Sequence, residues 1–133
     1  MKKFVIGVGG ALFKDGKLLV LKRNHDKKFM PGMWEIPGGK IEFQENPETA
    51  LKREFIEETG LEIGVGKPYE VWSYVQDAEN FYIEIDYLVH CSNSSQVKIS
   101  TNEHSEFKWI GQTEEVQTTR EMRSSLEKAW KTL

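Results

Sequence analysis

The sequence contains only one cysteine, Cys91, and four prolines among 133 residues. A single cysteine excludes a disulfide within the chain, so we expect a reducing, cytoplasmic setting. No apolar run approaches the roughly 18 residues that a membrane-spanning helix needs, so we expect no membrane partner. Internal repeats and linker-like segments are also missing, and the length predicts a single domain over residues 1–133.

The sequence also has no excess of positive charge. The formal net charge is −3, which argues against binding to a nucleic-acid duplex. The charges are nevertheless segregated along the chain. Residues 1–40 contain nine Lys or Arg against three Asp or Glu, whereas residues 41–62 contain seven Glu against two Lys or Arg. A basic segment is therefore followed directly by an acidic one.

Most of the secondary structure predicted from the sequence is β-strand. The apolar runs 4–13 and 17–23 flank Asp15-Gly16, a turn sequence typical of hairpins. The glycine-rich segment 37–39 is expected to be a loop. Further strands are expected at 34–36, 71–76, 81–90 and 106–110.

Two helices are predicted. Asn46 followed by Pro47 is a favourable helix start, and Gly60 is the residue expected just beyond the helix end. A second helix is indicated near the C-terminal end by Met122, Leu126 and Trp130, which recur every four residues. Because the strands outnumber the helices without alternating regularly with them, we expect an α+β fold, a mixed β-sheet flanked by helices.

The first predicted helix carries three carboxylates on one side. Glu54, Glu57 and Glu58 fall within an arc of about 100° on a helical wheel. They lie in the last turns, where the helix dipole is already negative, so each charge costs about 0.3–1 kcal/mol. In isolation, such a group is most often a solvated acidic surface. A divalent cation would remove the repulsion, and carboxylate oxygens are the ligands that Mg²⁺ and Mn²⁺ prefer.

The neighbouring sequence favours the cation. A double glycine at 38–39 lets backbone approach a ligand closely, and Glu45 supplies another carboxylate before the helix. The segment before these residues is basic. A metal beside cationic residues and a glycine-rich loop suits a phosphorylated substrate.

At these residues the sequence resembles the Nudix hydrolase family, whose motif is G-x5-E-x7-R-E-U-x-E-E-x-G-U with U a bulky apolar residue. The match runs from Gly39 through Glu45 to the segment Arg53–Leu61, and nine motif positions agree within 23 residues. Phe55 stands where an aliphatic residue is usual. The preceding segment 34–42 resembles MutT-like members of the family.

The resemblance implies an α/β/α sandwich with a loop–helix–loop box at 39–61. It also implies an enzyme that uses Mg²⁺, or Mn²⁺, to hydrolyse a nucleoside diphosphate linked to another group. By matching position, the metal ligands would be Glu54, Glu57 and Glu58, together with the backbone carbonyl of Gly38. Arg53 and Glu45 would orient the helix and the loop.

Two residues are candidates for the general base: Glu54 in the box and Glu106 in the segment 103–109. That segment resembles a late loop of the family that often supplies a further metal-binding or basic glutamate. Glu106 is therefore a candidate for both roles, and the role of Glu103 is open.

Substrate contacts are expected at Arg23, Gly38, Gly39 and Lys40. Family markers for ADP-ribose and dinucleotide hydrolases are missing after the box, so we expect a small nucleotide substrate, namely a nucleoside triphosphate split into a nucleoside monophosphate and pyrophosphate. The alternatives are hydrolysis of ADP-ribose, a nucleotide sugar or a dinucleoside polyphosphate, and a non-catalytic nucleotide sensor. In MutT-like members an asparagine reads the oxidised guanine, and it would fall near residues 117–121, where this sequence has none. The resemblance therefore argues against a preference for 8-oxo-dGTP. A monomer or a homodimer is expected.

Overall fold

A single mixed β-sheet organises the chain. The computed structural model describes residues 1–133 apart from the side chain of Ser95, and over this range the sheet has seven strands. The elements are β1 (Lys3–Lys14), β2 (Lys17–Arg23), β3 (Trp34–Glu35), β4 (Gly38–Lys40), α1 (Pro47–Thr59), β5 (Gly64–Val75), β6 (Asn80–His90), the 3₁₀ turn η1 (Ser94–Gln96), β7 (His104–Ile110) and α2 (Arg120–Trp130).

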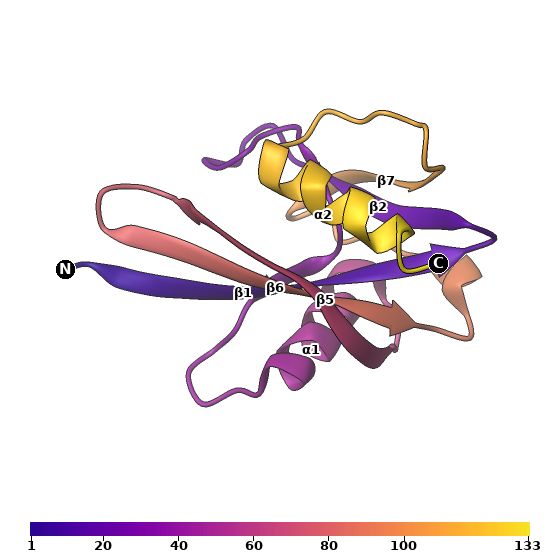
Figure 1. Ribbon diagram of the computed structural model, residues 1–133, viewed down its shortest axis with the longest axis horizontal. Helices are drawn as coiled ribbons and strands as arrows, with labels where there is room; N and C mark the ends of the chain where they lie inside the picture. Colours follow the sequence, from indigo (N-terminus) through magenta and orange to yellow (C-terminus); the bar gives the residue numbers. More distant parts are fainter.

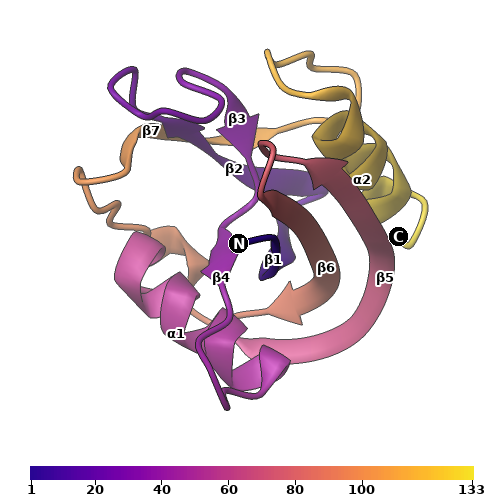
Figure 2. The same ribbon diagram turned by 90° about the vertical axis from the view of Figure 1, so that its left-hand side faces the viewer.

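The long strand β1 lies at the centre of the sheet. The strand order is β3-β2-β1-β6-β5, with β4 paired to β1 and β7 paired to β2. The β1–β6 pair is parallel, whereas β1 runs antiparallel to β2 and β4. Helix α1 covers one face of the sheet and α2 the other (Figure 1, Figure 2). The predicted mixed sheet flanked by helices is confirmed, as an α/β/α sandwich.

Each helix buries an apolar stripe against its own face of the sheet. From α1, Leu51 and Phe55 are completely buried in a cluster with residues of β1, β2 and β6. From α2, the predicted stripe of Met122, Leu126 and Trp130 packs in a second cluster on the opposite face. The packing of Leu51 and Phe55 fixes the position of α1 on its face of the sheet, and with it the position of the acidic box.

The ends of α1 form as the sequence predicts. The Asn46 side chain accepts a hydrogen bond from the Glu48 N–H at 2.8 Å, which caps the first turn. Gly60 ends the helix in the left-handed region, with φ 72°, and its N–H donates to the Ile56 carbonyl at 3.0 Å. These two caps place the glutamates of the box in the last two turns.

The structure corrects three predicted strand boundaries. The segment 37–39, expected as a loop, contributes Gly38 and Gly39 to β4, which pairs with Gly7–Gly9 of β1. Glycine is depleted in strands, so the local sequence does not indicate this pairing with β1. Strand β5 begins at Gly64 rather than Val71, and β7 begins at His104 rather than Glu106.

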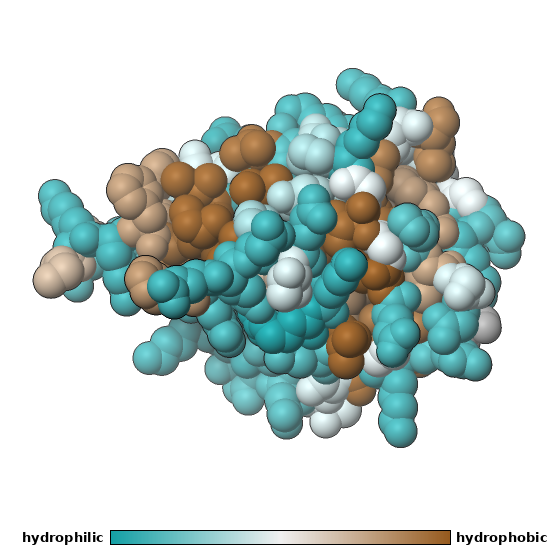
Figure 3. All heavy atoms as spheres, turned by 90° about the horizontal axis from the view of Figure 1, so that it is seen from below, coloured by the Kyte–Doolittle hydropathy of each residue, from teal (hydrophilic) through white to brown (hydrophobic). Residues whose placement is uncertain are grey.

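Apolar side chains are also exposed at one end of the sheet. Phe4, Val71, Val75 and Phe81 are all among the exposed large hydrophobic residues. In Figure 3 apolar atoms gather toward the left, the end at which the N-terminus lies in Figure 1. Within the described residues, no helix has the length and apolar character needed to cross a membrane.

The contact between β1 and α1 leaves no room for a side chain at Gly10. A Cβ atom there would lie 2.6 Å from the Phe55 ring and 3.0 Å from Val89. Gly10→Ala should therefore lower the free energy of unfolding by about 1–3 kcal/mol through overpacking. Urea denaturation followed by circular dichroism measures this change.

The matched control is Gly111→Ala, since a Cβ atom at Gly111 would meet no atom within 4 Å. We expect a change within about 0.5 kcal/mol there. Equal effects of the two substitutions would contradict the tight packing of α1 on β1.

Candidate active site

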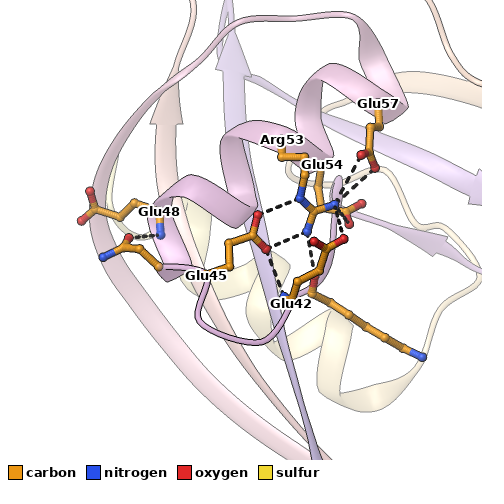
Figure 4. Close-up of polar contacts among 8 residues, drawn as sticks. Glu42, Glu45, Glu48, Arg53, Glu54 and Glu57 are labelled. Atoms are coloured by element: carbon orange, nitrogen blue, oxygen red, sulfur yellow. Dashed lines mark hydrogen bonds and ion pairs between the residues drawn. The ribbon is translucent and has the colours of Figure 1, made fainter.

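The guanidinium of Arg53 is the centre of the box. Its Nε and Nη2 atoms donate to the two carboxylate oxygens of Glu45, at 2.8 and 2.9 Å. Its Nη1 donates to Glu54 at 2.8 Å and lies 3.4 Å from both oxygens of Glu57, while Nη2 also donates to the Lys40 carbonyl at 3.1 Å. Figure 4 shows the guanidinium surrounded by these carboxylates. Arg53 therefore joins the loop, the helix and the end of β4.

This arrangement holds Arg53 and Glu45 in their charged forms. The hydrogen bonds from Arg53 lower the pKa of the Glu45 carboxyl to about 2. The same contact raises the pKa of Arg53 above its ordinary value. A two-pronged Arg–carboxylate pair of this kind fixes orientation as well as charge.

Glu58 lies on the buried side of α1 and is only 4% exposed. Its Oε1 atom accepts a hydrogen bond from the Gly38 N–H at 2.9 Å, which ties β4 to the helix. Burial, reinforced by the negative charge of Glu35, raises the pKa of Glu58 well above its ordinary value. A carboxyl group in this position needs a nearby cation to stay ionised at neutral pH.

Glu54 is more accessible than Glu58. Burial raises the pKa of Glu54, while the hydrogen bond from Arg53 acts in the opposite direction. A Cβ atom at Gly39 would collide with the Glu54 carboxyl group, so glycine at this position lets β4 approach the helix closely.

A histidine that the sequence analysis did not propose lies behind Glu58. His104 is completely buried at the start of β7, and its Nε2 lies 2.8 Å from the Glu35 carboxylate. Its Nδ1 lies 3.8 Å from Glu58 Oε2. Glu35 also accepts a hydrogen bond from Arg23 at 3.3 Å. A continuous chain of polar contacts thus runs from Arg23 on β2 to Glu58 on α1.

The acidic residues border a common cavity, lined by Glu54, Glu57, Glu58, Ser100, Asn102 and Glu103. Glu58, Glu103 and His104 each place one potential ligand atom within 4.8 Å of the others. A donor set dominated by carboxylate oxygens suits Mg²⁺ or Mn²⁺. The Glu58 carboxylate points to the same conclusion, because it is buried and has no Lys or Arg as an ion-pair partner among the described residues. A metal cation would supply the missing positive charge. The residues present therefore fit a divalent metal.

Glu106 is not brought into this group. It lies on β7 opposite Lys22, with its side chain about half exposed and 3.4 Å from the lysine ammonium. Glu103, in the turn before β7, borders the acidic cavity in its place. The sequence Glu-His-Ser-Glu at 103–106 indicates that this segment can supply an acidic residue to the site. Its spacing does not say which of the two glutamates points inward.

A second cavity, of about 370 Å³, adjoins the acidic one. The four predicted substrate contacts line it: Arg23, Gly38, Gly39 and Lys40. So do several aromatic side chains: Phe29, Trp34, Trp72, Tyr74 and Tyr82. Glu54, Glu58 and Glu103 border both cavities, so the aromatic cavity meets the acidic one at these three residues.

Comparisons with known proteins agree with this geometry. The family model of the NUDIX domain matches residues 3–128. The chain belongs to the Nudix family. The predicted family is confirmed, and relatives of the chain carry the names of enzymes of the predicted class.

Individual Nudix relatives are similar over most of the chain. An 8-oxo-dGTP diphosphatase of Buchnera aphidicola is 32% identical over 81% of this chain and 78% of its own length. A MutT-like protein of Streptomyces ambofaciens is 29% identical over 79% of this chain, and the match spans 62% of that relative. The crystal structure of a MutT NUDIX hydrolase from Burkholderia pseudomallei superposes with a TM-score of 0.84 at 27% identity, covering 96% of this chain and 98% of the other.

The Arg53–Glu45 contact predicts a pH-dependent stability. The pKa of Glu45 is about 2 in the fold against 4.5 ordinarily, so its stabilising effect is complete above pH 4.5 and is lost as the pH falls toward 2. Glu45→Gln should lower the free energy of unfolding at neutral pH. The difference from wild type should shrink below about pH 4.5, which urea titrations at stepped pH would measure.

Glu62→Gln is the control, because Glu62 is exposed and makes no ion pair with the side chains that the structure describes. Its stability relative to wild type should not change over the same pH range. A Glu45→Gln difference that stays constant down to about pH 3 would contradict the charged pair.

Proposed function

We propose that the chain is a Mg²⁺-dependent pyrophosphohydrolase that converts a nucleoside triphosphate to a nucleoside monophosphate and pyrophosphate. The observation that supports this proposal most directly is the junction of the two cavities at Glu54, Glu58 and Glu103. A flat base fits the aromatic cavity, and the phosphates would extend from it toward the carboxylates. The 8-oxo-dGTP diphosphatase among the relatives is named for the same class of reaction.

The carboxylates of the box would hold the metal. Glu54, Glu57 and Glu58 are the proposed ligands, with the Gly38 carbonyl as a further one. Bound there, a divalent ion stabilises charge on phosphoryl oxygens and increases the acidity of a nearby water. Arg53 positions Glu54 and Glu57 from the side, and the Gly38 N–H fixes Glu58.

The reaction needs a base and a group that neutralises the phosphates. A water oxygen forms a bond to phosphorus, the bridging P–O bond breaks, and pyrophosphate leaves. Glu54 is our proposed acceptor of the water proton, because it borders both cavities and burial raises its pKa. Arg23 and Lys40 line the substrate cavity and are the proposed phosphate contacts.

The proposed function is tested by measuring products released with Mg²⁺ from nucleoside triphosphates, nucleotide sugars, ADP-ribose and dinucleoside polyphosphates. We expect nucleoside triphosphates to give the highest kcat/KM, with pyrophosphate as product. Preferential cleavage of another class would overturn the proposed substrate and leave the family assignment intact.

Glu57→Gln tests the proposed metal ligands. The Glu57 side chain is 55% exposed, so its charge can be removed without disturbing the core. We expect kcat to fall by about 10²–10⁴-fold with the thermal unfolding midpoint nearly unchanged. Steady-state kinetics and circular dichroism on the same preparation measure both.

The metal itself is the control for this substitution. Excess chelator should abolish turnover by the wild-type enzyme, and added Mg²⁺ should restore it. Hydrolysis that persists in excess chelator, or near-normal turnover by Glu57→Gln, would refute the metal mechanism.

Glu103 and Glu106 can be separated by a matched pair of substitutions. Since Glu103 borders the acidic cavity and Glu106 pairs with Lys22 outside it, Glu103→Gln should reduce kcat by about 10–100-fold. Glu106→Gln should change kcat by less than about threefold. The reverse order would make Glu106 the functional residue of this segment, as its sequence position suggests.

A further inference from the structure

Two acidic residues lie on the sheet face beneath the aromatic cavity. Glu84 and Asp86 point from β6 to the same side of the sheet, and they are 7% and 0% exposed. The adjacent strand β1 has glycine where larger side chains would collide with them. A Cβ atom at Gly9 would lie 2.5 Å from Asp86 Oδ1 and 3.0 Å from Glu84 Oε2. The sheet is therefore shaped to hold this acid pair.

Protein donors satisfy only part of the pair. Asp86 Oδ2 accepts hydrogen bonds from Trp72 Nε1 at 2.8 Å and from Ser125 Oγ at 2.5 Å. Glu84 Oε1 accepts one from the Tyr82 hydroxyl at 3.0 Å. Glu84 Oε2 and Asp86 Oδ1 are buried and receive no hydrogen bond from another described residue, but the two carboxyl groups hydrogen-bond to each other.

The pair has more acceptor sites than donors. Burial, together with the charge of the neighbouring Asp86 and a hydrogen bond between the two carboxyl groups, raises the pKa of Glu84 well above its ordinary value. A proton shared between the two carboxyl groups is directed toward Asp86, and Glu84 Oε1 keeps a lone pair beyond the one that the Tyr82 hydroxyl uses. Toward the cavity, Glu84 therefore offers a hydrogen-bond acceptor that can take one further donor.

Only Glu84 of the two acids lines the cavity, together with Trp72, Tyr74 and Tyr82. The Trp72 and Tyr74 rings are stacked, with centroids 5.8 Å apart and an interplanar angle of 20°. Flat aromatic walls beside a buried acceptor match a planar heterocycle that donates a hydrogen bond from its edge. A carbonyl oxygen in the same place would face another acceptor and would be rejected.

We propose that Glu84, supported by Asp86, selects the nucleobase, and that it accepts bases with an exocyclic amino group in preference to those with a carbonyl at the same position. The inference rests on the proposed function for the nucleotide nature of the ligand. It predicts a preference for cytosine over uracil and for adenine over hypoxanthine, since each pair exchanges an amino donor for a carbonyl acceptor.

The test combines binding and turnover. Dissociation constants of CMP, UMP, AMP and IMP are measured by calorimetry, and kcat/KM is measured for CTP, UTP, ATP and ITP. The wild type should favour the amino member of each pair by at least about tenfold in both measurements. Glu84→Gln should reduce this ratio severalfold, because its amide N–H₂ can donate to a base carbonyl.

Glu84→Leu, which removes the acceptor, should bring the ratio close to one. Glu84→Gln keeps the shape of the side chain and decides the question if Glu84→Leu does not fold. Glu62→Gln is the exposed control and should retain the wild-type ratio.

The outcomes separate the two proposals. Hydrolysis of triphosphates without an amino preference, or with a preference that survives in both Glu84 variants, overturns the role of Glu84 and leaves the proposed function standing. Binding that favours CMP and AMP and depends on Glu84, without triphosphate hydrolysis, supports the role of Glu84 and overturns the proposed function.

Discussion

The two-pronged contact between Arg53 and Glu45 is the interaction on which the site depends. It attaches the loop after β4 to the middle of the helix, and the remaining guanidinium N–H groups reach Glu54 and Glu57. Without a cation at this point, several carboxylates would repel one another at the negative end of the helix dipole. Arg53 offsets part of that repulsion and also fixes the directions in which the carboxylates point.

The arginine does not reach the buried side of the box. Glu58 is held there by the Gly38 N–H, with His104 behind it. Gly38 and His104, which lie 20 and 46 positions from Glu58 in the sequence, therefore orient its carboxylate. The apolar packing of Phe55 against the sheet keeps the helix in place while its outer face accumulates charge. Glu54 and Glu57 lie away from this packed side of α1, whereas Glu58 is a polar group on its buried side.

Local signals in the sequence were sufficient for the box and its helix. Asn46 and Gly60 act through backbone groups within a few residues, so their roles can be predicted without knowledge of the fold. The strand at Gly38 and the inward position of Glu103 depend on partners distant in sequence, and no local pattern encodes them. The alternation in β6 places Glu84 and Asp86 on one face, but it does not say that α2 and β3 cover that face.

The parallel pairing of β1 with β6 has a consequence for how the molecule folds. Lys3 lies beside Asn80 and Leu12 beside Val89, so the central pair of strands closes a loop of more than half the chain. Contacts this distant in sequence form slowly because the loop must close before they contribute. During synthesis, the helix with the acidic box leaves the ribosome before β6 exists to support β1. The hydrolytic centre is thus assembled late, after its most recognisable sequence motif has long been made.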